Sequence, residues 1–203
     1  GCGIGSFLGM ISPEDYNEMQ KLAEQSRLKI PVLVGIDACH GYALKGGATV
    51  FPTNISAAAS FNKDLGYNIA KEAAKEVRGW GHHWVFTPTL DVTQDARFGR
   101  SGETFGECPT VTSVMADAYV KGYQGDLDPK DTVAACPKHY VGGGVSQGGC
   151  NHASAEISER TLRSTYLKPF KTAVDAGCLS IMGGHNDVAG VPVHASKWLL
   201  TDV

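Results

Sequence analysis

The amino-acid sequence predicts an α/β fold in which parallel strands alternate with helices, as an incomplete TIM (β/α)8-type barrel. Short apolar runs and amphipathic segments alternate about five times along the 203 residues, a pattern typical of parallel sheets with crossover helices. Polar clusters follow four of the apolar runs, and in such barrels the carboxyl ends of the strands carry the binding side chains. No G-x-G-x-x-G turn joins a strand to a helix, so the sequence favours a barrel over a dinucleotide-binding open sheet.

The predicted strands are short and continuously apolar, as expected for strands that are covered on both faces. They lie at 30–36, 84–88, 133–136 and 179–182, and the segment 5–10 has the composition of a strand remnant. The segment 42–61 is rich in Gly, Ala, Ser and Thr and is predicted to be a loop that crosses the top of the barrel.

Helices are expected where capping residues precede apolar positions at helical spacing. Ser12-Pro13 begins a helix to about Arg27, and Asn62 caps the next one. The remaining helices are predicted from Pro109, after Ser158 and from Ser196, and Pro169 should kink the second of these.

Composition excludes several classes of protein. The chain is 42% hydrophobic and 19% charged with a net charge of −3, which indicates an ordinary globular domain and does not favour nucleic-acid binding. No apolar run approaches the length of a membrane span. The six cysteines form no C-x-x-C pair, so we expect structural thiols and neither a metal nor a cofactor: Cys2, Cys39, Cys108, Cys136, Cys150 and Cys178.

The strongest candidate functional residues are Lys138 and His139, directly after the apolar run 133–136. A lysine at the end of a buried strand needs a polar partner, because an unpaired buried charge is costly. Asp37 follows the run 30–36 in the same way. Its carboxylate either binds a ligand such as a sugar hydroxyl or caps the following turn.

Two further clusters carry charged or polar groups. Arg97 and Arg100 lie in a long polar loop with three acids nearby, so they form either a network that aims a guanidinium into a pocket or surface ion pairs. His185 follows the run 179–182 and is either a pocket residue or a turn residue. No G-x-S-x-G, Walker loop or H-E-x-x-H is present.

Five motifs, in this order, resemble the N-terminal barrel domain of family 3 glycoside hydrolases of the β-glucosidase type. They are G-I-D-A-C-H-G at 35–41, T-V-F-P at 49–52, D-A-R-F-G-R with E-T-F-G-E at 95–107, V-A-A-C-P-K-H-Y at 133–140 and G-V-P at 190–192. The resemblance implies that residues 1–203 are part of one such domain, with a β-glucoside or oligosaccharide as substrate. It also implies the substrate-binding residues: Asp37, Arg100, Lys138, His139 and, where the family often has tyrosine, His185.

The resemblance also implies that no catalytic residue lies in this chain. The family's nucleophile is an aspartate of a Ser-Asp motif beyond the segment 199–203, and the acid/base glutamate comes from a further domain. Asp202 has a helical context and is not expected to be the nucleophile. We therefore expect the first and last strands of the barrel and the C-terminal part of the chain to be missing, and the piece alone to be inactive and poorly soluble. The family favours a secreted or periplasmic location.

The resemblance leaves more than one activity open. In the N-acetylglucosaminidase branch of the family, a histidine in the loop after Lys-His acts as acid/base, and His152 lies in the corresponding loop here. Its surroundings look more like those of the glucosidase branch. Two further candidates are a β-xylosidase of the same family and a non-catalytic sugar-binding barrel.

Overall fold

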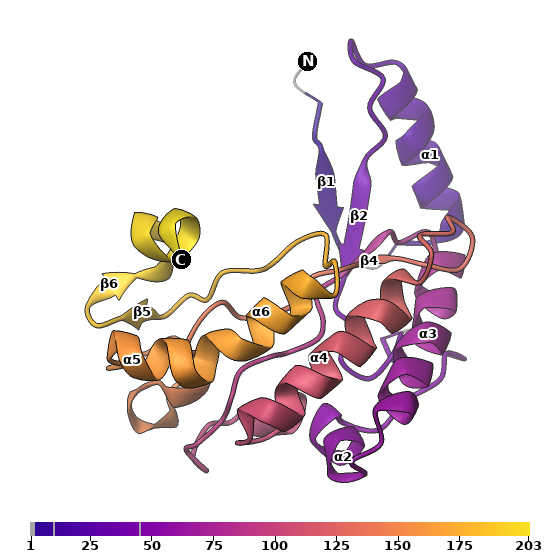
Figure 1. Ribbon diagram of the computed structural model, residues 1–203. Helices are drawn as coiled ribbons and strands as arrows, with labels where there is room; N and C mark the ends of the chain where they lie inside the picture. Colours follow the sequence, from indigo (N-terminus) through magenta and orange to yellow (C-terminus); the bar gives the residue numbers. More distant parts are fainter. Residues whose placement is uncertain (1–2, 10, 45) are drawn as a thin grey trace.

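The computed structural model describes residues 3–9, 11–44 and 46–203 and has the alternating α/β architecture that the sequence predicts (Figure 1). Its main sheet contains four parallel strands in the order β1-β2-β3-β4, so strands that follow one another along the chain lie side by side. The strands are β1 (Ser6–Leu8), β2 (Leu33–Ile36), β3 (Trp84–Val85) and β4 (Ala134–Ala135). Within the described part of the chain this sheet stays open, with β1 at one edge.

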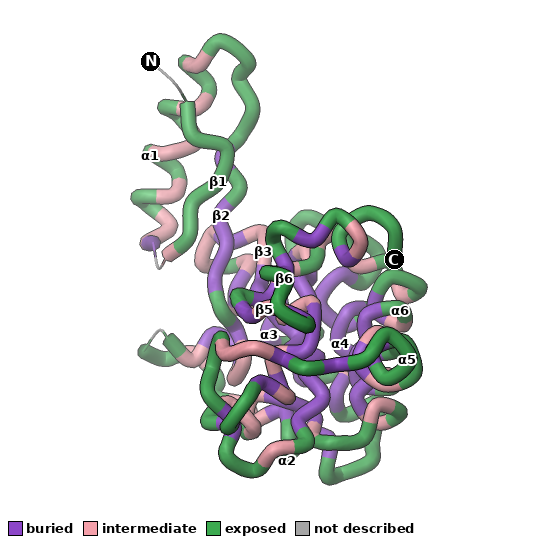
Figure 2. Tube along the Cα trace, turned by 90° about the vertical axis from the view of Figure 1, so that its left-hand side faces the viewer, coloured by how far each residue is buried: buried purple, intermediate pink, exposed green. Residues whose placement is uncertain are grey.

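Helices cover one side of the sheet, and most of the core lies between the two layers. The helices are α1 (Pro13–Glu24), α2 (Asn54–Ala59), α3 (Lys63–Gly79), α4 (Pro109–Gln124), α5 (Glu159–Thr161) and α6 (Leu167–Asp175). α4 packs between α3 and α6 (Figure 1). Figure 2 shows the buried residues concentrated around β3, α3 and α4, whereas β1 and α1 are largely exposed.

Capping interactions fix the starts of the helices where the sequence predicts them. The Ser12 hydroxyl accepts a hydrogen bond from the Asp15 amide at 3.0 Å, and the Asp15 carboxylate accepts one from the Ser12 amide. Asn62 accepts hydrogen bonds from the first amides of α3. The predicted helix after Ser158 is not a continuous α-helix, because the π-helical turn Leu162–Tyr166 separates α5 from α6, which contains Pro169.

Two predictions of local structure were wrong, and one pair of strands was not predicted. The predicted loop 42–61 contains α2, because Thr53 caps an alanine-rich segment. The predicted strand 179–182 forms no regular strand, because only Met182 makes backbone hydrogen bonds to the chain after β4, with Pro137 and Tyr140. The hairpin β5 (Asp187–Val188) and β6 (Val191–Pro192) was not predicted. It turns at Ala189 and Gly190, both with positive φ.

The shorter helical turns lie on the loops: Ser101–Glu103, Gly143–Val145, Gln147–Gly149 and Val193–Ala195 are 3-10 turns, and Trp198–Asp202 is a π-helical turn. Cys2 and Met10 lie outside the described residues. Among the helices described, none is both long and apolar enough to cross a membrane.

Candidate functional site

The predicted site residues lie at the carboxyl ends of three neighbouring strands. Asp37 directly follows β2, Arg100 lies in the long loop after β3, and Lys138 and His139 follow β4. Because parallel strands end at the same edge of a sheet, these side chains meet although they are far apart in the sequence.

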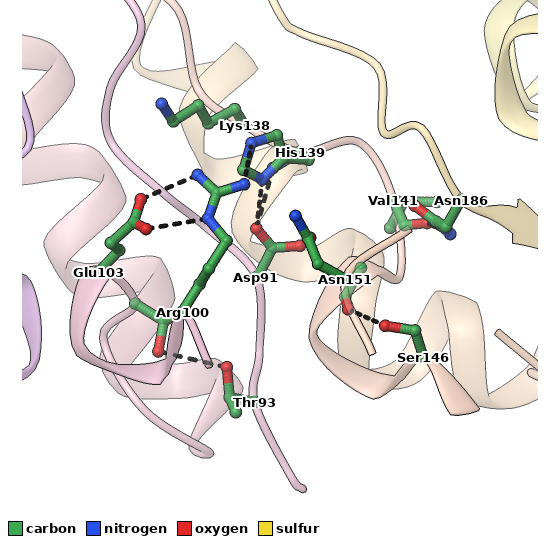
Figure 3. A network of polar contacts seen from close by, with 12 residues as sticks. Asp91, Thr93, Arg100, Glu103, Lys138, His139, Val141, Ser146, Asn151 and Asn186 are labelled. Atoms are coloured by element: carbon green, nitrogen blue, oxygen red, sulfur yellow. Dashed lines mark hydrogen bonds and ion pairs between the residues drawn. The ribbon is translucent and has the colours of Figure 1, made fainter. Parts of the chain in front are cut away.

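Arg100 is at the centre of a hydrogen-bonded network (Figure 3). Its Nε and Nη2 donate to the two carboxylate oxygens of Glu103, each at 2.9 Å, and its Nη1 lies 3.2 Å from Nε2 of His139. The bidentate contact fixes the plane of the guanidinium. Hydrogen bonding to Arg100 lowers the pKa of the Glu103 carboxyl and raises the pKa of the Arg100 guanidinium.

Asp91 holds His139 from the other side. One carboxylate oxygen of Asp91 accepts hydrogen bonds from Nδ1 of His139 at 2.8 Å and from its backbone amide at 3.2 Å. A guanidinium can only donate, so Nε2 of His139 must be the acceptor toward Arg100, and the proton lies on Nδ1. The network therefore sets both the orientation and the tautomer of His139.

Lys138 and Asp37 form the second part of the site. The ammonium group of Lys138 donates to the Asp37 carboxylate; the side chain of Lys138 is only 4% exposed, whereas that of Asp37 is 53% exposed. The buried lysine thus has the partner that it requires, and Asp37 keeps an exposed face. The Cys39 thiol lies between the two parts, 3.8 Å from the Glu103 carboxylate, and burial is the main cause of its raised pKa.

Two predicted residues lie outside this network. Arg97 is turned toward Asp95 at 2.7 Å and its side chain is 70% exposed, so it forms a surface ion pair and does not point into a pocket. His185 stacks with His152 and His194, with ring centroids 5.0 and 5.6 Å apart. It is exposed and has no direct contact with the other four predicted residues among the interactions described.

A family model described as the glycosyl hydrolase family 3 N-terminal domain matches residues 11–203. The chain belongs to glycosyl hydrolase family 3. The predicted family is therefore confirmed, and so is the predicted fold class, since a β-glucosidase of Listeria innocua superimposes with a TM-score of 0.93 at 35% identity, over 98% of this chain and 28% of the other.

The curated proteins that this chain resembles include β-xylosidases and β-glucosidases. A β-xylosidase of Formosa agariphila is 38% identical over 96% of this chain and 28% of its own length. A periplasmic β-glucosidase of Salmonella typhimurium is 34% identical over 98% of this chain and 26% of its own. The chain thus spans between a quarter and a third of the length of these relatives.

Asp91 and Glu103 take part in the site but were not predicted as site residues. The sequence contains a signal for Asp91, because this acid comes shortly after the predicted strand 84–88. In the structure the chain continues from β3 to Thr89, which bridges to Lys138 and brings Asp91 next to His139. Glu103 was counted among the acids near Arg100, but only the folded loop shows that it, and not Asp95, binds this arginine.

A cavity of about 660 Å³ lies elsewhere. It is a mainly apolar groove between α6 and the C-terminal turn, lined by residues that include Tyr140, Phe170, Val174, Ile181 and Leu199. Val174 of α6 is 55% exposed there. This groove contains none of the four predicted sugar-binding residues at the strand ends.

Proposed function

We propose that this chain is the sugar-binding part of a retaining β-glycosidase, a β-glucosidase that hydrolyses terminal non-reducing β-D-glycosides of oligosaccharides. The observation that carries the proposal is the convergence of Asp37, Arg100, Lys138 and His139 from three neighbouring strand ends. This group of one acceptor, two cations and an imidazole suits neighbouring hydroxyl groups, each of which can donate and accept.

Each side chain has a role that its chemistry supports. The exposed carboxylate of Asp37 accepts hydrogen bonds from sugar hydroxyls, and the ion pair with Lys138 holds it in place. Arg100 donates through Nη1, and the Nε2 of His139 accepts, so a hydroxyl that enters between them replaces their mutual contact without loss. Asp91 and Glu103 hold these two residues.

The two catalytic carboxyl groups are proposed to come from outside this chain. A retaining mechanism needs one carboxylate to attack the anomeric carbon and one carboxylic acid to protonate the leaving oxygen, about 5–5.5 Å apart. The acids at this site are already used, because Asp91 binds His139, Glu103 binds Arg100 and Asp37 pairs with Lys138. We therefore expect the 203-residue chain to bind a sugar weakly and not to hydrolyse it.

Hydrolysis of aryl β-glucosides tests the proposal. The full-length protein should release the aryl alcohol, and the 203-residue chain should not. Turnover by the short chain would contradict the proposal that the catalytic groups lie elsewhere. A full-length protein that hydrolyses no aryl glycoside would instead support a non-catalytic sugar-binding barrel, and a downstream strand that ends in Ser-Asp would argue against such a barrel.

A β-xylosidase is the second candidate, supported by the Formosa agariphila relative. The ratio of kcat/KM for aryl β-xyloside and aryl β-glucoside decides between them.

If the protein is instead an N-acetylglucosaminidase, His152→Ala should abolish turnover of an aryl N-acetylglucosaminide. Unchanged turnover in this variant would remove the N-acetylglucosaminidase from the candidates. A periplasmic or secreted location is proposed from the Salmonella relative, and cell fractionation would test it.

A further inference from the structure

Three exposed histidines form a row beside the proposed sugar site. The ring centroids of His152 and His185 are 5.0 Å apart at an interplanar angle of 72°, and those of His185 and His194 are 5.6 Å apart at 45°. They come from three different segments: the loop after β4, the chain that pairs with Tyr140, and the 3-10 turn Val193–Ala195. Tertiary structure, not local sequence, therefore builds this row.

The backbone and the neighbouring residues hold the row in place. His152 has a left-handed backbone with φ 69°, a conformation that is unfavourable for a residue with a side chain. Its Nε2 lies 3.1 Å from the side-chain amide nitrogen of Asn151, which can only donate, so the ring proton of His152 is on Nδ1. The ring of His194 lies over Gly183, where an added Cβ would be 3.0 Å from its Cε1.

No acid neutralises these rings. Among the described residues, the one histidine within ion-pair distance of a carboxylate is His139, with Asp91. The acids on the same segments are occupied, since Asp187 accepts hydrogen bonds from Ser154 and Gly190, and Glu156 accepts one from Ser154.

Arg100 is the cation of the sugar site that acts on the row, and Glu103 pairs with it on its other side. Burial is the largest cause of the lowered pKa of His152, followed by the proximity of His185, Arg100 and His139. These last two belong to the sugar site, so the row lies within electrostatic range of that site. The row of histidines offers imidazole N–H donors, and the nearby Arg100 adds positive charge. A ligand that accepts hydrogen bonds and carries a negative charge would be attracted by both features.

We propose that the row of His152, His185 and His194 binds a carboxylate or sulfate group on the part of the substrate next to the sugar bound by Arg100 and His139. This inference rests on the proposed function and narrows its substrate class to β-glycosides with an acidic neighbouring group. A metal ion is a poorer occupant, because the rings form a row instead of a triangle, and no group of three such side chains in the described residues could hold a metal ion.

The proposal predicts a pH-dependent preference for acidic substrates. A bound anion favours the protonated, cationic form of an imidazole, and this attraction works against the lowered pKa of His152. An exposed ion pair contributes up to about 1 kcal/mol, or roughly fivefold, per imidazolium. The preference should therefore be small at pH 8 and grow as the pH falls to 5.5.

The test compares 4-carboxyphenyl β-D-glucoside with its neutral 4-carbamoyl analogue in the full-length protein. The ratio of their kcat/KM values should rise roughly three- to tenfold between pH 8 and pH 5.5. A 4-sulfophenyl glucoside measured in parallel shows whether a carboxylate or a sulfur oxyanion is preferred. A ratio that does not change with pH for either anion would overturn the proposal.

Variants separate this role from a general loss of activity. His152→Gln and His194→Gln should each lower the ratio at pH 5.5 about two- to fivefold, and Lys21→Gln, at an exposed cation on α1, should leave it unchanged. Equal losses on both substrates would contradict anion binding by these rings. If the full-length protein hydrolyses none of the glucosides, the proposed function fails. Calorimetric binding of the same compounds then tests the histidine row separately. Equal affinities for the acid and the amide at pH 5.5 would contradict anion binding by the row.

Discussion

At the scale of single residues, Asp91 fixes the hydrogen-bonding state of His139 from behind. Its side chain is 1% exposed, and one of its oxygens accepts both N–H groups of His139. In Asp91→Asn the amide oxygen is a weaker, uncharged acceptor, and the NH2 group faces donors if the amide is flipped. Hydrogen bonds to charged groups contribute about 1.5–3 kcal/mol, so we expect kcat/KM for an aryl β-glucoside to fall roughly 10- to 100-fold in the full-length protein.

Asp95→Asn is the matched control for this substitution. Asp95 also accepts hydrogen bonds from a basic residue, Arg97, but this pair is exposed and lies outside the network around Arg100. Exposed ion pairs contribute little, so its kcat/KM should change less than about twofold. Equal losses in the two variants would show that the buried contact to His139 has no special role.

The sequence predicted the residues that directly follow apolar strands better than the residues that support them. Asp37, Lys138 and His139 could be located because a polar group that directly follows a buried strand must meet a polar partner or a ligand at the strand end. Which acid binds Arg100 could not be predicted, since Asp95, Glu103 and Glu107 are all close in sequence. The choice depends on the turn Ser101–Glu103, which brings Glu103 back to the guanidinium.

At the scale of elements, the turn Gln147–Gly149 supports the loop that carries Arg100. Gly149 has φ 69°, and a Cβ at this position would be 2.6 Å from the carbonyl carbon of Arg97 and 2.7 Å from the amide of Phe98. Backbone atoms cannot move aside separately, so Gly149→Ala should displace the segment that leads into Arg100. We expect at least a tenfold lower kcat/KM for an aryl β-glucoside, measured by steady-state kinetics on the full-length protein.

Gly148→Ala provides a close control. Gly148 has nearly the same φ, 67°, but the nearest atom to its added Cβ is the Cys150 sulfur at 3.8 Å. Both substitutions therefore share the backbone strain of about 1–2 kcal/mol, and only Gly149→Ala adds the clash with the Arg97 loop. If the two variants lose activity equally, backbone strain explains the effect and the loop contact does not.

His83 ties α1 and β2 to the start of β3. Its Nδ1 accepts from the Val34 amide at 3.2 Å, which leaves the proton on Nε2, 2.9 Å from the Tyr16 hydroxyl. Burial, Arg78 and His82 lower its pKa to about 4. The unfolded state binds a proton at His83 near pH 6.5, and the folded state binds it only near pH 4. The contacts of the neutral imidazole therefore stabilise the fold fully above pH 6.5, and this stabilisation is lost as the pH falls from 6.5 to 4.

The free energy of unfolding should therefore fall by about 1–3 kcal/mol from this group as the pH drops from 7 to 4, a value reduced for its partial exposure. His83→Asn keeps an acceptor for the Val34 amide but does not titrate, so its stability should depend less on pH. Urea denaturation of the two proteins between pH 7 and pH 4 measures the difference. Parallel curves would contradict the role of His83.

Helix starts were predicted well because capping is local, and strand lengths were not, because pairing is not local. Ser12 and Asn62 cap their helices within three residues, so the sequence contains the whole interaction. The apolar segment 179–182 has the composition of a strand, but only Met182 makes backbone hydrogen bonds to the chain after β4. Which backbone groups meet there is decided by the neighbouring segment and not by composition.

At the scale of the whole molecule, apolar side chains are exposed along the N-terminal edge of the open sheet. β1 is exposed along its full length and forms an edge of the sheet. Large apolar residues of 4–33 are exposed as well: Ile4, Phe7, Leu8, Leu22, Leu28, Ile30 and Leu33. The apolar groove beside Tyr140 and Phe170 adds a second such surface. Unpaired strand edges and exposed apolar patches of this kind promote association between chains.

The 203-residue chain, prepared alone, should therefore associate as its concentration rises. Phe7→Lys with Leu8→Lys places charges on the exposed edge strand, and such charges oppose edge-to-edge pairing, so this double variant should shift sedimentation toward the monomer. Asn17→Lys with Gln25→Lys, at exposed positions on α1 and its C-terminal cap, adds the same charge away from the edge and should not have this effect. A wild-type chain that sediments as a monomer and unfolds in one sharp cooperative transition would show that the open edge is tolerated, and that the neighbouring parts of the protein are not needed to cover it.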